Sequence, residues 1–263
     1  MAQPGKWEDL APRLASGGAM AGAGVALIWL GGAWFTALCA IVGGLMIWEL
    51  ARMIAPERRA EALALGAVGA GVIVLARLLP PVFALPLLAA PALVGVSLLR
   101  RHGAIFVTFA LGILIASFGL SLFRDSYGAV WLFWLVLVVI ATDVFGYFGG
   151  RIIGGPKFWP RVSPRKTWSG TLSGWVAAAL IGVLFRQFTN AGVDLPWISV
   201  VLSMASQMGD VAESAVKRKM GVKDSSNLLP GHGGLFDRFD GLLGAALFML
   251  LVAQIVYVPA VRF

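Results

Sequence analysis

The sequence predicts an all-α, polytopic integral membrane protein with about nine transmembrane helices, each of roughly 20 residues. Composition is the first observation: 59% of the 263 residues are hydrophobic and only 13% are charged. This balance excludes an ordinary soluble domain. The second observation is the distribution of charge. Basic residues occur in short clusters between long apolar runs, as in loops that meet anionic lipid headgroups.

The net charge of +8 does not indicate a nucleic-acid-binding protein, because the basic residues form no stripe on a soluble surface. The single cysteine, Cys39, lies inside an apolar run, where we expect it to serve packing. One cysteine excludes an intrachain disulfide and any metal site built from several cysteines.

We expect the chain to begin with an interfacial amphipathic segment at residues 1–16, in which charged residues are interspersed with Trp and Leu. Nine predicted spans follow, at residues 17–30, 33–54, 60–79, 82–99, 104–123, 128–148, 171–185, 195–217 and 239–258. The breaks between them are Gly-Gly, Pro-Pro or charged clusters, which end apolar helices. Residues 17–148 thus hold spans one to six. Residues 149–263 hold the cytoplasmic-face loops, the candidate catalytic region, with spans seven to nine in the same integrated membrane domain.

The basic residues also predict the orientation. With the N-terminus in the cytoplasm, alternation of the loops leaves only four of the 21 basic residues outside, namely Arg77, Arg124, Arg186 and Arg262. The positive-inside rule favours this arrangement. Both long polar segments, near residues 151–170 and 218–238, would then face the cytoplasm, where nucleotides are available.

The densest polar stretch in the chain runs from Ser206 to Asp240. Asp210, Ser214 and Lys217 follow one another at helical spacing, which places them on one face of a helix. A carboxylate on a membrane helix is costly and usually faces a polar cavity or a partner. Beyond the helix, cations precede the Gly-rich turn at residues 230–234, and acidic residues follow it. Carboxylates, cations and glycines together are typical of a metal–phosphate site, and hence of an enzyme that handles phosphates at a membrane surface.

Asp210 is the strongest candidate for a magnesium ligand, with either Asp237 or Asp240 completing the site. Interhelical ion pairs of Asp210 or Glu213 with nearby lysine and arginine explain the same pattern about as well. The role of Glu213 therefore stays open. So does that of Glu49, which either extends to the membrane surface or reaches a site.

A second polar region follows the sixth predicted span. Asp143 and Tyr147 share a helix face, and the spacing of Gly146 and Gly150 permits close helix contact. The loop S-P-R-K-T-W-S-G at residues 163–170 combines cations, hydroxyls and a glycine at a helix start, which suits a phosphate. Alone, such a loop is more often a cytoplasmic membrane anchor.

The segment from Ser214 to Asp240, S-A-V-K-R-K-M-G-V-K-D-S-S-N-L-L-P-G-H-G-G-L-F-D-R-F-D, resembles the full signature of the phosphatidate cytidylyltransferase (CDP-diacylglycerol synthase) family. The regions at residues 143–151 and 163–170 are similar to a second conserved region of that family. Two departures are visible: Ser169 stands where many members carry an acidic residue, and Gly146 where alanine is usual. The first weakens any role for position 169, and the second exchanges one small residue for another.

The resemblance implies transfer of a cytidylyl group from CTP to phosphatidate, giving CDP-diacylglycerol and pyrophosphate in phospholipid biosynthesis. It implies a Mg²⁺ cofactor, with an additional monovalent cation left open, and a multi-pass protein of a bacterial-type inner membrane whose active site faces the cytoplasm. The expected partners are CTP, phosphatidate and the lipid bilayer, but no nucleic acid; a homodimer is left open.

Residues that match the motifs are assigned to three groups. The catalytic group is Asp210, Lys217, Asp237 and Arg238, of which Asp210 and Asp237 are the predicted metal ligands. The substrate-binding group is Asp143, Ser163, Lys166, Thr167, Ser214, Arg218, Lys223, Asp224, His232, Gly233, Gly234 and Asp240.

Two other functions fit parts of the pattern. A CTP-dependent cytidylyltransferase for another lipid phosphate, such as an ether lipid phosphate, would need the same phosphate-binding residues. A secondary transporter would also bury carboxylates in membrane helices, but it predicts internal repeats and helices broken at the midplane. The sequence instead concentrates its charges toward one face of the membrane.

Overall fold

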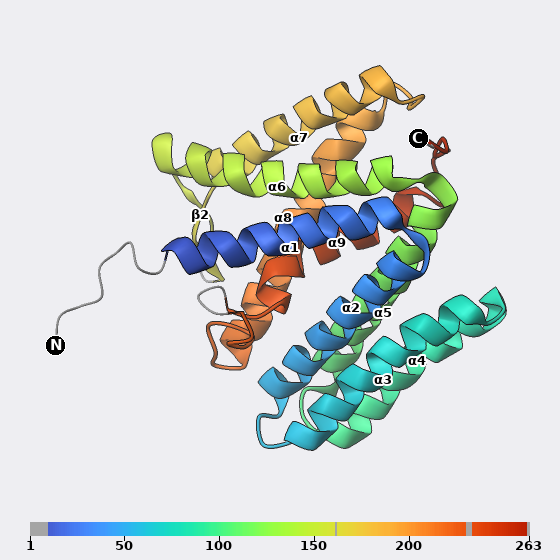
Figure 1. Cartoon of the computed structure of the whole chain (residues 1–263). Coiled ribbons are helices and arrows are strands. Elements are labelled where there is room, and N and C mark those ends of the chain that lie inside the picture. Colours follow the sequence, from blue (N-terminus) through green and yellow to red (C-terminus); the bar gives the residue numbers. More distant parts are fainter. Residues whose placement is uncertain (1–9, 161, 230–232, 262–263) are drawn as a thin grey trace. The chain divides into compact units, whose positions relative to one another are not determined.

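The computed structural model describes residues 10–160, 162–229 and 233–261 (Figure 1). This part of the chain forms nine α-helices, one 3-10 turn and one two-stranded sheet. The helices are α1 (Leu10–Leu30), α2 (Gly32–Ile54), α3 (Arg59–Leu78), α4 (Ala84–Leu99), α5 (Gly103–Tyr127), α6 (Ala129–Ile152), α7 (Trp168–Phe188), α8 (Leu195–Lys219) and α9 (Phe236–Val252). The 3-10 turn is η1 (Pro81–Phe83), and the strands are β1 (Lys157–Trp159) and β2 (Ser163–Thr167).

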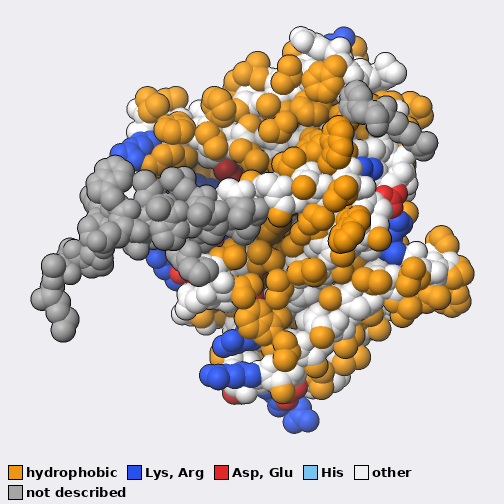
Figure 2. All heavy atoms as spheres, viewed as in Figure 1, with side chains coloured by type: hydrophobic (Ala, Val, Ile, Leu, Met, Phe, Trp, Pro, Cys, Tyr) orange, Lys and Arg blue, Asp and Glu red, His pale blue; other side chains and the backbone are white. Residues whose placement is uncertain are grey.

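The predominantly helical fold is therefore confirmed, and each predicted span overlaps a helix. The last span, predicted at residues 239–258, is too long, because α9 ends at Val252. Six helices of the described chain, α2 to α7, are long and apolar enough to cross a membrane, η1 being counted with α4. Side chains such as Leu78, Ile152 and Trp197 are 77%, 79% and 72% exposed, and hydrophobic atoms cover much of the face in Figure 2. Exposed apolar surface on this scale belongs in lipid. The chain is a multi-pass membrane protein.

The chain divides into two units, the first comprising residues 1–117 and 222–237. Within it, glycines allow α2 and α3 to pack backbone to backbone. A Cβ atom added at Gly44 would lie 2.7 Å from the carbonyl oxygen of Gly66, and one at Gly66 would lie 2.8 Å from that of Gly44. The C-terminal half of α2 is largely buried, and this half carries Glu49.

The second unit comprises residues 118–221 and 238–263. In it α7 packs against both α6 and α8. The close contact predicted for Gly146 and Gly150 is confirmed, because a Cβ atom at Gly170 of α7 would lie 2.4 Å from the carbonyl oxygen of Gly146 and 3.3 Å from the Cα of Gly150. Buried hydroxyls join α6 to α8, where Thr142 Oγ1 and Ser203 Oγ are hydrogen-bonded at 2.7 Å.

The polar loop between α6 and α7 contains an antiparallel hairpin, in which Lys157 pairs with Thr167 and Trp159 with Ser163. The all-α prediction is wrong at this hairpin. Thr167 ends β2 and also caps α7, since its Oγ1 accepts a hydrogen bond from the backbone N–H of Gly170 at 3.2 Å. The hairpin therefore leads directly from Lys166 into a capped helix.

Candidate active site

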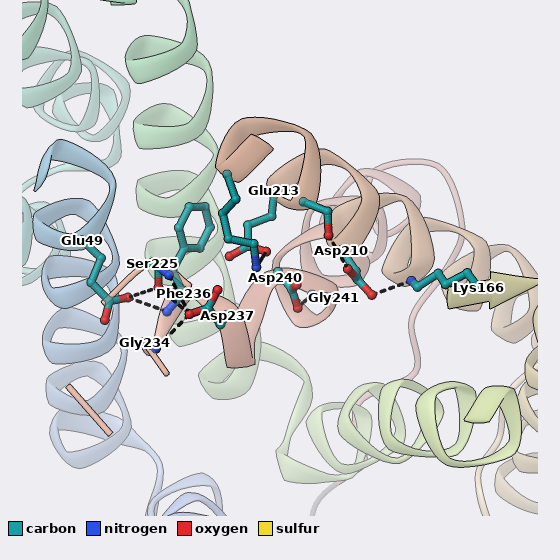
Figure 3. A network of polar contacts seen from close by, with 12 residues as sticks. Glu49, Lys166, Asp210, Glu213, Ser225, Gly234, Phe236, Asp237, Asp240 and Gly241 are labelled. Atoms are coloured by element: carbon teal, nitrogen blue, oxygen red, sulfur yellow. Dashed lines mark hydrogen bonds and ion pairs between the residues drawn. The ribbon is translucent and has the colours of Figure 1, made fainter. Parts of the chain in front are cut away.

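Six charged residues of the second unit interact around the C-terminal half of α8, and we call them the lysine–carboxylate cluster. Its members are Asp143, Lys166, Asp210, Glu213, Lys217 and Asp240. They come from four elements: α6, β2, α8 and α9. Figure 3 shows Lys166 reaching toward Asp210, with Glu213 and Asp240 nearby.

Small residues bring the two acidic helices of this cluster together. A Cβ atom at Gly209 would lie 2.3 Å from the carbonyl oxygen of Asp240, and one at Gly244 would lie 2.3 Å from that of Ala205. A larger side chain at either glycine would push α8 and α9 apart. Asp210 and Asp240 therefore lie near each other because the residues beside them have no side chain.

Asp210 is held by two partners. Lys166 Nζ lies 2.5 Å from its Oδ2, and Ser214 Oγ donates to its Oδ1 at 3.2 Å. The Lys166 and Asp210 side chains keep 27% and 32% of their surface exposed, so a ligand can reach the pair. The sequence reasoning placed Asp210 and Ser214 on one helix face, and this is confirmed; the ion pair with Lys166 adds a partner from the hairpin.

Asp240 and Glu213 are the more enclosed acids of the cluster. The Asp240 carboxylate accepts a hydrogen bond from the backbone N–H of Gly241 at 2.6 Å. The charge of the Asp240 carboxylate interacts with those of Asp210 and Lys217. Glu213 is completely buried and ion-paired with Lys217 one turn later. The ion pair of Glu213 with Lys217 lies within α8, whereas the pairs considered from the sequence were between helices.

A different arrangement surrounds Asp237, in the first unit. Its Oδ2 accepts hydrogen bonds from the Ser225 N–H at 2.8 Å, the Ser225 hydroxyl at 2.9 Å and the Gly234 N–H at 2.8 Å. Glu49 accepts hydrogen bonds from the same segment (Figure 3). We call this group the loop anchor: Glu49, Ser225, Ser226, Gly234, Leu235, Phe236 and Asp237.

The remaining predicted residues lie as follows. Ser163 and Thr167 are in the hairpin, with Thr167 buried. Arg218, Lys223, Asp224 and Arg238 have exposed side chains. Gly233 has φ +79°, a left-handed conformation that favours glycine. His232 lies outside the described residues.

The donor chemistry of the lysine–carboxylate cluster suits Mg²⁺. Magnesium binds carboxylate oxygens and substrate phosphates, usually with only one or two protein carboxylates. Asp210 interacts unfavourably with both Asp143 and Asp240, and a divalent cation would offset that repulsion. Among residues 10–160, 162–229 and 233–261, no group of three or more His, Cys, Asp or Glu side chains is arranged to hold a metal.

The role of Glu49 was left open by the sequence, and no feature of the sequence singled out Ser225 or Ser226. The available signal was the occurrence of an acidic residue inside an apolar span. The partners of Glu49 lie more than 170 residues later in the chain, so spacing could not reveal them.

Residues 11–256 match the cytidylyltransferase family. A phosphatidate cytidylyltransferase of Brucella abortus biovar 1 (strain 9-941) is 38% identical over 251 residues, covering 89% of this chain and 90% of that protein. The phosphatidate cytidylyltransferase of Bacillus subtilis (strain 168) is 43% identical over 122 residues, 45% of each chain. That of Mycobacterium bovis is 39% identical over 137 residues, 51% of this chain and 44% of that protein. These matches show that the chain belongs to the cytidylyltransferase family.

Proposed function

We propose that this protein transfers the cytidylyl group of CTP to phosphatidate, forming CDP-diacylglycerol and pyrophosphate. The observation that carries the proposal is the lysine–carboxylate cluster, in which Lys166 and Lys217 are fixed beside acids at one end of apolar helices. The similarity to a phosphatidate cytidylyltransferase extends over 89% of the chain. Residues 11–256, which match the cytidylyltransferase family, include all four elements of the cluster.

The physical demands of the reaction match this arrangement. The attacking group is a lipid phosphate, which is already anionic at neutral pH and needs no strong general base. The main obstacles are the approach of two polyanions and the charge that develops on the departing pyrophosphate. Fixed cations act on both by positioning and by electrostatic stabilisation. Each lysine ammonium has three N–H donors, so Lys166 and Lys217 can keep a carboxylate partner and also bind a phosphate oxygen.

Asp210 together with Asp240 is the ligand pair for Mg²⁺ that the geometry favours. Both are on closely packed helices of one unit, and their charges interact. Asp237, which was assigned from the sequence as the second metal ligand, already accepts three hydrogen bonds at one oxygen. When bound, the metal supplies positive charge to phosphate oxygens; the protein's part is to hold the two carboxylates in place. An additional monovalent cation and a homodimer stay predictions.

We also propose that the chain crosses a bacterial-type inner membrane nine times, with its N-terminus in the cytoplasm. The lysine–carboxylate cluster would then face the cytoplasm. The ion pair of Lys166 with Asp210 supports one part of this topology. It requires the α6–α7 loop and the C-terminal half of α8 to lie on the same side of the membrane. Reporter fusions within residues 155–160 and after Val261 should give opposite sides. The same side for both would contradict the topology.

The function is tested with purified protein, radiolabelled CTP and phosphatidate in mixed micelles. We expect labelled CDP-diacylglycerol and pyrophosphate in equal amounts, dependent on Mg²⁺. A preference for an ether lipid phosphate in the same assay would support the alternative substrate. Uptake of a solute by proteoliposomes, without any CTP-dependent product, would instead favour a transporter.

A further inference from the structure

We infer that Glu49 is a positioning residue for the proposed reaction, because it holds the other residues of the loop anchor in place, including Leu235 and Phe236 at the start of α9. The inference rests on the proposed function for its catalytic consequence, but its structural part stands on contacts within the first unit. Glu49 lies near the C-terminal end of α2, and its side chain is completely buried.

The carboxylate of Glu49 takes the place of a helix cap. The backbone N–H of Leu235 donates to its Oε1 at 2.8 Å, and that of Phe236 donates to its Oε2 at 2.6 Å. N–H groups at a helix start have no partner inside the helix, and negative charge is favourable there. The N–H groups at the start of a helix are usually capped by a side chain just before the helix. Here the capping carboxylate belongs to a residue of α2 that lies 186 residues before Leu235 in the sequence.

Hydroxyl groups complete the shell around Glu49. Ser226 Oγ donates to its Oε1 at 2.5 Å. Ser225 Oγ lies 3.3 Å from Glu49 Oε2 and 2.9 Å from Asp237 Oδ2, so one hydroxyl joins the two carboxylates. A buried carboxylate without donors would be strongly unfavourable. With these donors, its position in α2 determines where the loop lies.

Gly234 shows how closely the loop is fitted to Glu49. A Cβ atom at this position would lie 1.9 Å from Ser225 Oγ and 2.7 Å from Glu49 Oε1. Both distances are too short for a Cβ atom, so a side chain here would displace the Ser225 hydroxyl and the Glu49 carboxylate. Phe236 then turns inward, fully buried, with its ring 5.9 Å from that of Phe109 in an edge-to-face contact. The loop is thus held at adjoining points by polar and apolar contacts.

Glu49→Gln is the direct test. Each carboxylate oxygen accepts one backbone N–H, so an amide must turn its NH₂ group toward one of these donors. We expect faster hydrogen exchange at the amides of Leu235 and Phe236, with exchange in α6 and α7 unchanged. We also expect kcat, per folded molecule, to fall about tenfold to a hundredfold, the range for losing a hydrogen bond to a charged group. Glu61→Gln is the matched control, because Glu61 is 35% exposed and paired with Arg58; it should resemble the wild type.

Ser226→Ala provides a second variant that leaves the buried charge and both backbone donors in place. It should raise hydrogen exchange at the amide of Leu235 and lower kcat by a smaller factor than Glu49→Gln does. In the double variant, the loss of kcat should be smaller than the two single losses combined. Unchanged exchange at Leu235 and Phe236 in both variants would overturn the inference. So would a lower melting temperature with wild-type kcat, which is the result for a purely structural residue. If the wild type makes no CDP-diacylglycerol, the proposed function fails, while the exchange experiment still reports on Glu49.

Discussion

Glu49 in the loop anchor and Glu213 in the lysine–carboxylate cluster are both completely buried, yet their partners differ in kind. Backbone N–H groups and serine hydroxyls surround Glu49, and all of these donors are neutral. Glu213 is paired with the cation of Lys217, a flexible side chain one turn away on the same helix. Asp237 likewise accepts hydrogen bonds from the backbone of Ser225 and Gly234, and Asp210 is ion-paired with Lys166.

The difference bears on what each region can do. Backbone donors cannot leave a carboxylate without moving the chain, so the loop anchor is suited to holding a shape. A lysine can exchange part of its contact with an acid for a phosphate oxygen, because both are charge-assisted partners of similar geometry. The lysine–carboxylate cluster is accordingly the region that we expect to contact substrate. The loop anchor is the region that we expect to hold residues 234–237 in place.

The largest effect is expected for Asp210→Asn, which lowers the ligand charge and keeps the shape. We predict a fall in kcat of about a hundredfold or more, as for the loss of a charge-stabilising group in other active sites, and a higher Mg²⁺ concentration for half-maximal activity. The melting temperature should change little, since 32% of the side chain is exposed. Activity is measured against Mg²⁺ concentration, and melting by fluorescence.

The control for this variant is Asp194→Asn at the opposite end of α8, where the side chain is exposed and makes no capping hydrogen bond. It should behave as the wild type. Wild-type metal dependence in Asp210→Asn, together with a lowered melting temperature, would show that Asp210 is only an ion-pair partner and would remove the distinction between the two regions.

A smaller effect is expected for Asp237→Asn. The amide oxygen can still accept the hydrogen bonds from Ser225 and Gly234, but bonds to an ionised acceptor are about twice as strong as neutral ones. We predict a lower melting temperature and a roughly tenfold fall in kcat, with the Mg²⁺ requirement unchanged. A raised Mg²⁺ requirement here, and not in Asp210→Asn, would assign the metal to Asp237.

Most of the helices could be predicted because glycine and proline pairs in the sequence coincide with the ends of helices. Gly31-Gly32 and Pro80-Pro81 interrupt apolar runs where helices do end. Two local signals were misleading. Arg124–Tyr127 was expected to be a loop but continues α5, and α6 extends past Gly149 and Gly150 to Ile152. There the glycines pack against α7, and tertiary contact overrides the tendency of glycine to end a helix.

The candidate site was predictable only where its residues share one helix. The spacing of Asp210, Ser214 and Lys217 shows a common face because a helix repeats regularly. The contacts of Lys166 with Asp210, and of Glu49 with the start of α9, join segments far apart in the chain. No periodicity encodes such contacts. The hairpin was missed for a related reason, since strands of three and five residues are too short to show alternation.

The smallest effect is expected for Ser214→Ala. Its hydroxyl donates to Asp210 Oδ1 at 3.2 Å, which is long for a hydrogen bond. The loss of one such bond corresponds to about a threefold to tenfold fall in kcat. If Ser214 only orients Asp210, kcat should fall by this factor with the KM for CTP unchanged, and the variant should have no further effect in an Asp210→Asn background. If Ser214 contacts substrate directly, as the sequence predicted, KM should rise and the two effects should add. Ser97→Ala, at an exposed serine of α4, controls for the loss of a hydroxyl. We expect the first result, because the hydroxyl already has a carboxylate partner within the cluster.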